Sequence, residues 1–173
     1  MVAALVLTGA PGTGKSSVLE ALTTLLETEG IDYGSIECEQ LAMGSPLLSG
    51  REWTQQLDAV LALQRTAGRR RFLIAATIET VEELRAVVSA AQADLLLVVC
   101  LSAPAEVVAA RIADREPDRW PGKARLIAHA RELALAVPAF DGIDLIVDTE
   151  GRIAEEVAAD IHDAMKIRGL ITA

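Results

Sequence analysis

Residues 8–17 read TGAPGTGKSS, and they follow directly on the apolar run VAALVL at positions 2–7. The segment fits the pattern G-x-x-x-x-G-K-[ST] without a mismatch, and the apolar run predicts a strand before it. Glycines let backbone N–H groups turn toward a phosphate, and a following helix directs its positive dipole end at the same anion. Lys15 can then bridge the β- and γ-phosphates of a nucleoside triphosphate, and the Ser16 hydroxyl can ligate Mg²⁺. The predicted phosphate-binding residues are Gly9, Ala10, Pro11, Gly12, Thr13, Gly14, Lys15, Ser16 and Ser17.

The composition of the 173-residue chain fits one domain, residues 1–173, which needs no disulfide or metal for stability. Sixteen basic and 25 acidic residues give a net charge of −9, which argues against a protein that grips nucleic acid. The longest apolar run, residues 95–101, is far shorter than the ~20 residues that span a bilayer. Cys38 and Cys100 lie in apolar runs and are predicted to be buried thiols. We expect a cytoplasmic monomer or homodimer without a nucleic-acid or membrane partner.

Short apolar runs alternate with segments of helical periodicity, which predicts βαβ units and a parallel sheet. The predicted strands cover residues 2–7, 33–38, 72–76, 95–101 and 143–147. One helix follows the phosphate-binding loop. Two more open at Ser49 and Thr80, each with a Glu three residues later as in a capping box. Further helices are expected over residues 104–115, 123–137 and 153–167. The prediction is a three-layer α/β domain whose ligands bind at the carboxyl ends of the strands.

Two carboxylates, Glu37 and Glu39, stand at the end of the second predicted strand. Alternate residues of a strand point to the same side, so both can face one site. One could hold Mg²⁺ through water, and the other could accept a proton from a substrate hydroxyl. A solvated strand end is the alternative interpretation. Glu79, after the third strand, could contact substrate or metal, or only favour the dipole of the next helix.

Arginines are concentrated in the segment AARIADREPDRWPGKAR, residues 109–125. Arg111 and Arg115 are four residues apart and therefore neighbours on one helix face. The alternative is a charged helix face followed by an ordinary loop. His129 and His162 lie on helical segments, have no carboxylate partner that the pattern can place, and are predicted to be surface residues.

These motifs together resemble the small P-loop kinases of metabolites, such as shikimate, gluconate and adenylylsulfate kinases, with nucleoside and nucleotide kinases as wider relatives. The resemblance implies a P-loop nucleoside triphosphate hydrolase fold with five parallel strands in the order 2-3-1-4-5. It also implies ATP and Mg²⁺ as cofactors and transfer of the γ-phosphoryl group to a hydroxyl of a small molecule. In those kinases the second strand commonly ends in Asp-x-Asp, and Glu37 and Glu39 occupy the matching positions with longer side chains.

The resemblance also implies roles for individual residues. Glu37 would join Ser16 at the metal, and Glu39 would act on the acceptor hydroxyl. Arg111 and Thr149 would bind the adenine end of the nucleotide.

One segment receives a role in the same way: residues 115–123 would form a lid in which Arg115 completes the catalytic set with Lys15 and Glu39. Residues 40–70 are the expected acceptor-binding region because they lie between the second and third strands. Arg51 and Arg65 in this segment would either pair with an anionic substrate or solvate a helix.

Two other functions stay open at this point. The chain could be a nucleotide-binding regulator or a degenerate kinase that binds ATP without turnover. The loop GAPGTGKS also resembles that of AAA+ NTPases, but those need an acidic pair after the third strand and a further helical domain. The acceptor itself is not specified: a nucleoside, a sugar acid and an antibiotic hydroxyl all fit.

Overall fold

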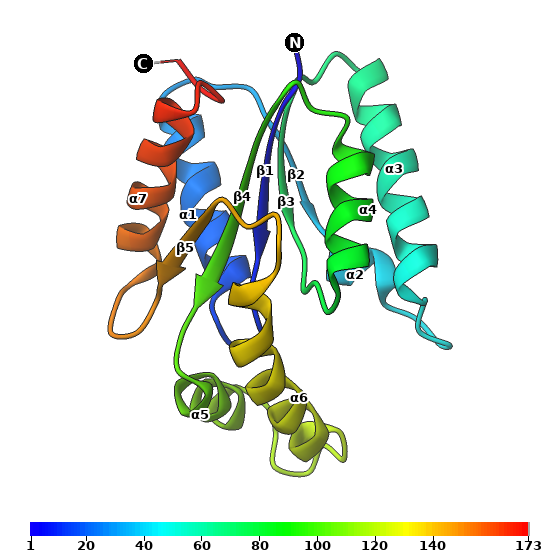
Figure 1. Ribbon diagram of the computed structural model, residues 1–173, viewed down its shortest axis with the longest axis vertical. Coiled ribbons are helices and arrows are strands. Elements are labelled where there is room, and N and C mark those ends of the chain that lie inside the picture. The colour runs from blue at the N-terminus through cyan, green and yellow to red at the C-terminus, as the bar shows by residue number, and fades with distance from the viewer. Residues whose placement is uncertain (173) are drawn as a thin grey trace.

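The computed structural model describes residues 1–172 and consists of a parallel sheet with helices on both faces (Figure 1). The strands are β1 (Ala3–Thr8), β2 (Gly34–Glu37), β3 (Arg71–Ala75), β4 (Leu95–Ser102) and β5 (Leu145–Asp148). Their order in the sheet is β2-β3-β1-β4-β5, with every neighbouring pair parallel. The predicted three-layer architecture and the strand order 2-3-1-4-5 are confirmed.

The helices divide into three groups, two on the faces of the sheet and one at its carboxyl end. The helices are α1 (Lys15–Thr28), α2 (Cys38–Ala42), α3 (Gly50–Thr66), α4 (Val81–Ala91), α5 (Ala105–Arg115), α6 (Lys123–Ala136) and α7 (Ala154–Ile167), with a 3-10 turn at Val137–Ala139. Helices α1 and α7 cover one face, and α3 and α4 cover the other (Figure 1). None of the helices in residues 1–172 is both long and apolar enough to cross a membrane.

Alternation along the central strand divides the apolar residues between two cores. Leu5 and Leu7 of β1 lie in the core shared with α1 and α7. Ala4 and Val6 lie in the core shared with α3 and α4. All four are fully buried, as expected for a central parallel strand with helices on both faces. Cys38 and Cys100 are buried thiols, as predicted.

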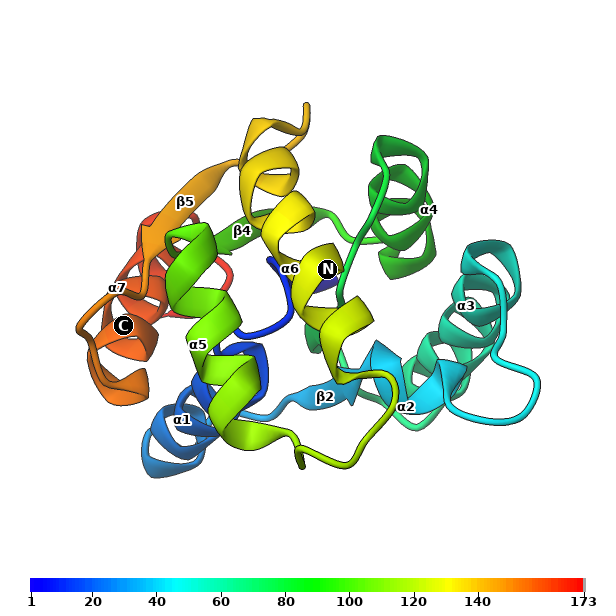
Figure 2. The ribbon, with the colours of Figure 1, turned by 90° about the horizontal axis from the view of Figure 1, so that it is seen from below.

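Helices α5 and α6 lie at the carboxyl ends of the strands, as the view from below shows (Figure 2). They pack on each other through a small apolar cluster made of Ala103, Val108, Ile112 and Ala130. The connection between them, residues 116–122, coincides with the predicted lid. The predicted phosphate-binding loop, the two predicted carboxylates and the predicted lid therefore all lie at this end of the sheet.

Most strand boundaries differ from the prediction by one residue, and the start of β5 differs by two. Strand β2 ends at Glu37, and Cys38 begins helix α2, so the expected strand end at residue 38 is wrong. Strand β5 begins at Leu145 rather than at residue 143, because Asp144 first forms a separate contact. Its carboxylate accepts a hydrogen bond from the Val98 N–H at 2.8 Å, and the pairing of β5 with β4 begins one residue later, at Leu145 and Val99.

The two predicted capping boxes differ. At Ser49 both reciprocal bonds form: the hydroxyl accepts from the Glu52 N–H, and the Glu52 carboxylate accepts from the Ser49 N–H at 2.8 Å. At Thr80 the hydroxyl accepts from the Glu83 N–H at 3.1 Å, but the Glu83 carboxylate accepts from the N–H of Glu79 instead. The Glu83 carboxylate therefore bonds to the residue before the N-cap, and the second capping box is incomplete.

The surface prediction is wrong for His162, which is buried, whereas the His129 side chain is 38% exposed; both side chains have carboxylate partners that the sequence pattern did not place. His162 is buried between α1 and α7, where its Nε2 lies 3.0 Å from a Glu29 oxygen. His129 on α6 lies 2.8 Å from the Glu79 carboxylate. These partners are 133 and 50 residues away in sequence, so no local pattern could reveal them.

We predict that Ser49→Ala lowers the free energy of unfolding by about 1 kcal/mol, because it removes the N-terminal cap of a 17-residue helix. Urea denaturation followed by circular dichroism measures the loss. Ser89→Ala is the control, since Ser89 is exposed inside α4, and it should leave stability within about 0.5 kcal/mol of wild type. Equal effects of the two substitutions would contradict the capping argument.

Candidate active site

The loop between β1 and α1 passes so close to its neighbours that glycine is required at two positions. Gly9 has φ of 141°, and a Cβ there would lie 2.4 Å from the Leu101 carbonyl oxygen. At Gly12, with φ of 87°, a Cβ would lie 2.8 Å from the Val108 carbonyl oxygen. The loop therefore packs directly on the end of β4 and on α5. This close packing leads the chain into the N-terminus of α1, where free N–H groups favour an anion.

Lys15 carries a buried positive charge above this loop. Its Nζ donates to the carbonyl oxygens of Gly9 at 3.0 Å and Ala10 at 3.3 Å, and lies 3.9 Å from a Glu39 oxygen. Burial lowers the pKa of Lys15 from its ordinary value of 10.5, and the Glu39 carboxylate partly opposes this shift. Arg115 lowers the pKa of Lys15 further. A phosphate group at this position would replace the missing solvation of the ammonium group.

Glu37 and Glu39 both reach the site, but not by the strand alternation predicted. Glu37 ends β2, and Glu39 lies in the first turn of α2, so a change of element brings them together. The Ser16 hydroxyl donates to Glu37 at 3.0 Å. One Glu39 oxygen accepts from the Thr77 N–H at 2.8 Å and from the Thr77 hydroxyl at 2.6 Å. Thr77 thus fixes the Glu39 carboxylate beside Lys15.

The oxygen atoms of Ser16 and Glu37 fit a magnesium site shared with phosphates. Mg²⁺ usually takes one or two protein oxygens and completes its shell with water and phosphate oxygens. Within residues 1–172 no cluster of three or more His, Cys, Asp or Glu side chains could hold a metal by itself. The donor set therefore fits a metal that is bound together with a nucleotide.

Three adjoining cavities follow the carboxyl edge of the sheet. The central cavity, about 330 Å³, is lined by Pro11, Gly12, Gly14, Lys15, Ser16, Ser17, Glu37, Glu39, Thr77, Arg115 and Leu126. The β5-side cavity, about 300 Å³, is lined by Gly12, Thr13, Gly14, Ser17, Val18, Arg111, Thr149, Arg152, Ala154 and Val157. The β2-side cavity, about 270 Å³, is lined by Cys38, Glu39, Ala42, Leu47, Leu48, Gly50, Trp53, Thr77, Glu79 and Glu83. The central cavity shares residues with both of the others.

The two predicted arginines lie in different cavities. Arg111 donates to the Gly12 carbonyl at 3.2 Å and to the Thr149 hydroxyl and carbonyl at 3.0 and 2.7 Å. It thus ties the loop to the end of β5. Arg115 lines the central cavity, and its guanidinium pairs with Glu116 at 2.8 Å. Because the Arg115 side chain is 60% exposed, it has room to change partners.

The segment predicted as a lid is held at both ends by one lysine. The Lys123 ammonium group donates to the carbonyl oxygens of Ala113 at 2.6 Å and Glu116 at 2.8 Å, and to the Asp118 carboxylate at 2.7 Å. Trp120 is partly exposed and lines none of the three cavities. The lid role stays a prediction.

The segment 40–70 contributes an apolar wall rather than basic groups. Leu47, Leu48 and Trp53 line the β2-side cavity. Arg65 instead donates to the carbonyl oxygens of Ala90 and Ala91 at the end of α4 and lies over the Phe72 ring. Of the two alternatives predicted for Arg65, the structure therefore favours the contact with a helix over pairing with an anionic substrate.

Three residues at the site had no predicted role there. Arg152 lines the β5-side cavity, Leu126 lines the central one, and Thr77 anchors Glu39. Arg152 had one sequence signal, a basic residue directly after the turn at Gly151. Nothing in the local pattern marked Leu126, or linked Thr77 to a carboxylate 38 residues earlier.

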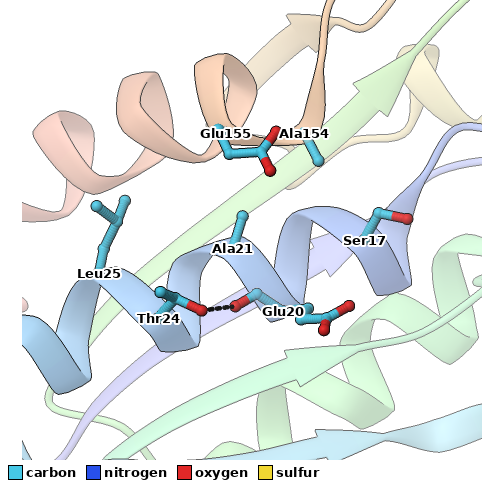
Figure 3. A pocket seen from close by; sticks show the side chains of 7 residues that line it. All are labelled: Ser17, Glu20, Ala21, Thr24, Leu25, Ala154 and Glu155. Atoms are coloured by element: carbon cyan, nitrogen blue, oxygen red, sulfur yellow. Dashed lines mark hydrogen bonds between the residues drawn. The ribbon is translucent and has the colours of Figure 1, made fainter.

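A further groove lies between α1 and the start of α7 (Figure 3). It encloses about 340 Å³ and is lined by Ser17, Glu20, Ala21, Thr24, Leu25, Ala154 and Glu155. The Thr24 hydroxyl donates to the Glu20 backbone carbonyl at 3.0 Å. Two carboxylates make this groove unsuitable for phosphates. The anion site is therefore the central cavity, where Lys15 stands.

Comparison with known proteins agrees with this geometry. The AAA domain family matches residues 5–137, and no curated protein matches the sequence. A sugar kinase from Janibacter sp. HTCC2649 gives a TM-score of 0.69 at 16% identity, covering 100% of both chains. The shikimate kinase from Acinetobacter baumannii in complex with shikimate gives 0.62 at 16% identity, covering 99% of this chain and 97% of that one. The APS kinase from Mycobacterium tuberculosis in complex with AMPPNP and APS gives 0.62 at 21% identity, covering 95% and 98%. The shared fold is that of P-loop kinases.

We predict that Lys15→Met weakens ATP binding at least ~100-fold, or about 2.8 kcal/mol, because the triphosphate loses its buried cation. The melting temperature should not fall, since the substitution also removes an ammonium group whose burial is unfavourable. Isothermal titration calorimetry and thermal denaturation measure the two effects. Lys166→Met, far from the loop on α7, is the matched control and should bind ATP normally. Wild-type ATP affinity in Lys15→Met would rule out the phosphate site.

Proposed function

We propose, since the chain belongs to the AAA domain family and has the fold of P-loop kinases, that it is an ATP-dependent phosphotransferase. In this proposal it moves the γ-phosphoryl group of Mg-ATP to a hydroxyl of a small molecule. The nucleotide phosphates occupy the central cavity, the base end occupies the β5-side cavity, and the acceptor occupies the β2-side cavity.

One observation carries the proposal: the central and β2-side cavities share Glu39 and Thr77. A carboxylate at the junction of a phosphate site and a second cavity is where a proton acceptor must stand if phosphate passes between them. A protein that only bound nucleotide, or that used water as its acceptor, would not need the second cavity. The APS kinase with the same fold is described in complex with both a nucleotide analogue and a second ligand.

The reaction can be written with the residues of the chain in named positions. The acceptor oxygen attacks the γ-phosphorus, the bond from that phosphorus to the β–γ bridging oxygen breaks, and ADP leaves. The acceptor proton passes to the Glu39 oxygen that does not face Thr77. Lys15 stabilises the negative charge on the transferring group. Mg²⁺, held by Ser16 and Glu37, would neutralise charge on the phosphate oxygens.

The direct test is ADP release from Mg-ATP against a panel of hydroxyl compounds, beside a blank without acceptor. The proposal expects ADP release above the blank with at least one compound, together with a phosphorylated product. Binding of ATP without turnover for any compound would favour a nucleotide-binding regulator. Equal ADP release with and without every acceptor would indicate a hydrolase.

We predict that Glu39→Gln lowers the turnover number with an acceptor at least ~100-fold, the usual contribution of a general base, while Mg-ATP still binds. Thr77 can donate to the Gln oxygen, so the position of the side chain should be kept. Glu37→Gln is the comparison variant and should instead raise the Mg²⁺ concentration required for half-maximal activity. Steady-state kinetics at several Mg²⁺ concentrations separate the two. Unchanged turnover in Glu39→Gln would exclude it as the base.

We predict opposite effects for the two cavity arginines. Arg115→Ala should bind ATP nearly as wild type and turn over ~100-fold slower, a barrier increase of about 2.7 kcal/mol, if Arg115 acts on the transition state. Arg111→Ala should lose nucleotide affinity first, because Arg111 joins the loop to Thr149. Arg85→Ala, exposed on α4 and outside both the cavities and the predicted lid, is the control. Indistinguishable kinetics for the Arg111 and Arg115 variants would contradict this division.

A further inference from the structure

We infer, on the basis of the proposed function, that the acceptor is an amine-bearing hydroxyl compound, cationic at neutral pH, rather than a carboxylate, sulfate or phosphate ester. The inference rests on the charges and walls of the β2-side cavity, where the acceptor would lie. It names a substrate class that differs in charge from shikimate and APS, the ligands bound in two structures of the same fold.

All charged side chains that line the β2-side cavity are acidic. They are Glu39 at the junction with the central cavity, and Glu79 and Glu83 at the start of α4. Glu39 is held by Thr77 and stands near Lys15, and Glu79 lies beside His129 on α6. Glu83 accepts from the Glu79 N–H and has no cationic partner within residues 1–172. An anionic acceptor would meet repulsion on both sides of the cavity, whereas a cation would gain attraction.

The basic residues of segment 40–70 do not compensate for this charge. Arg65 and Arg70 are hydrogen-bonded to backbone carbonyls at the far end of α3 and α4. Arg69 bonds to Gln64 at the same end. Arg51 is exposed and does not line the cavity. Lys15 and Arg115 face the central cavity, where the triphosphate needs them.

The remaining wall sets the size and polarity of the acceptor. Trp53, Leu48 and Leu47 supply apolar surface, and Trp53 is almost fully buried. Burial raises the pKa of the Cys38 thiol to about 12, so this residue stays neutral and adds no reactive thiolate. The cavity therefore fits a small polyhydroxylated or hydroxyalkyl amine, with its hydroxyl at Glu39 and its ammonium group toward Glu79 and Glu83.

This placement is consistent with the proton balance of the reaction. The acceptor hydroxyl loses its proton to Glu39 as its oxygen bonds to the γ-phosphorus. The amine keeps its own proton throughout, so its nitrogen has no free lone pair and only the hydroxyl oxygen attacks the phosphorus. The product is a phosphate monoester with an ammonium group, formed together with ADP.

The test compares three groups of acceptors with Mg-ATP and measures both ADP release and product phosphate. The cations are glucosamine, kanamycin and ethanolamine, the neutral compounds are glucose and N-acetylglucosamine, and the anions are gluconate, shikimate and adenylylsulfate. We expect at least one cation to be phosphorylated with a kcat/KM at least ~10-fold above every anion, the size of a charge-assisted hydrogen bond. If glucosamine is that substrate, the kcat/KM for N-acetylglucosamine should be lower by the same factor, because acetylation removes the positive charge.

A charge-neutralising variant tests whether the carboxylates of the β2-side cavity cause the preference for cationic acceptors. Glu79→Gln should raise KM for the cationic acceptor ~10-fold and leave KM for ATP unchanged. Glu82→Gln removes a neighbouring exposed carboxylate outside the cavity and should change neither value. Trp53 fluorescence, read in a Trp120→Phe background, reports acceptor binding independently of turnover.

The outcomes separate the inference from the proposed function. Phosphorylation of gluconate, shikimate or adenylylsulfate in preference to all three cations overturns the inference and leaves the phosphotransferase intact. Failure of every cation to be phosphorylated or to change Trp53 fluorescence also overturns it. Absence of acceptor-dependent ADP release with compounds of every charge would count against the phosphotransferase itself.

Discussion

The close approach of residues 9–12 to β4 and α5 is the constraint on which the rest of the site depends. A side chain at Gly9 would collide with the Leu101 carbonyl, and one at Gly12 would collide with the backbone of Val108. Because the nearest atom at each of these glycines belongs to the backbone of β4 or α5, the loop packs closely against α5. This packing brings Arg111 within reach of the Gly12 carbonyl and Thr149, and directs Arg115 toward the central cavity. Two of the three cavities, the central one and the β5-side one, meet at this loop.

The loop also carries the main energetic cost of the site, the buried ammonium group of Lys15. The unfolded chain keeps this proton up to the ordinary pKa of 10.5, whereas the folded chain releases it at lower pH because burial disfavours the charge. The cost is therefore fully present below the folded-state pKa, and the free energy of unfolding rises with pH between that value and 10.5. Two carbonyl oxygens and Glu39 offset part of the cost. A polyphosphate is the ligand that would offset the rest.

The sequence predicted those features that are determined locally. The phosphate-binding loop is a contiguous motif, and the strand order follows from the family that the motif resembles. The convergence of Glu37 and Glu39 was expected for the wrong reason, since Glu39 arrives on a helix after the strand has ended. Other features depend on contacts between distant segments. These are the hydrogen bonds from Thr77 to Glu39, the burial of His162, and the hydrogen bond from Arg65 of α3 to the end of α4. Residue type and spacing alone carry no information about those contacts.

Glu39 links the two halves of the site through its competing partners. With Lys15 3.9 Å away, the Glu39 carboxylate is attracted to the ammonium group, which competes with anything that binds in the β2-side cavity. A triphosphate in the central cavity would compete for the same ammonium group, because its charge is larger than that of one carboxylate. Glu39 would then face the second cavity while Thr77 still holds one of its oxygens. In the proposed reaction, binding of the phosphoryl donor would therefore free the Glu39 carboxylate for the acceptor. The proposed donor and acceptor sites share this carboxylate, so binding at one site would be coupled to binding at the other.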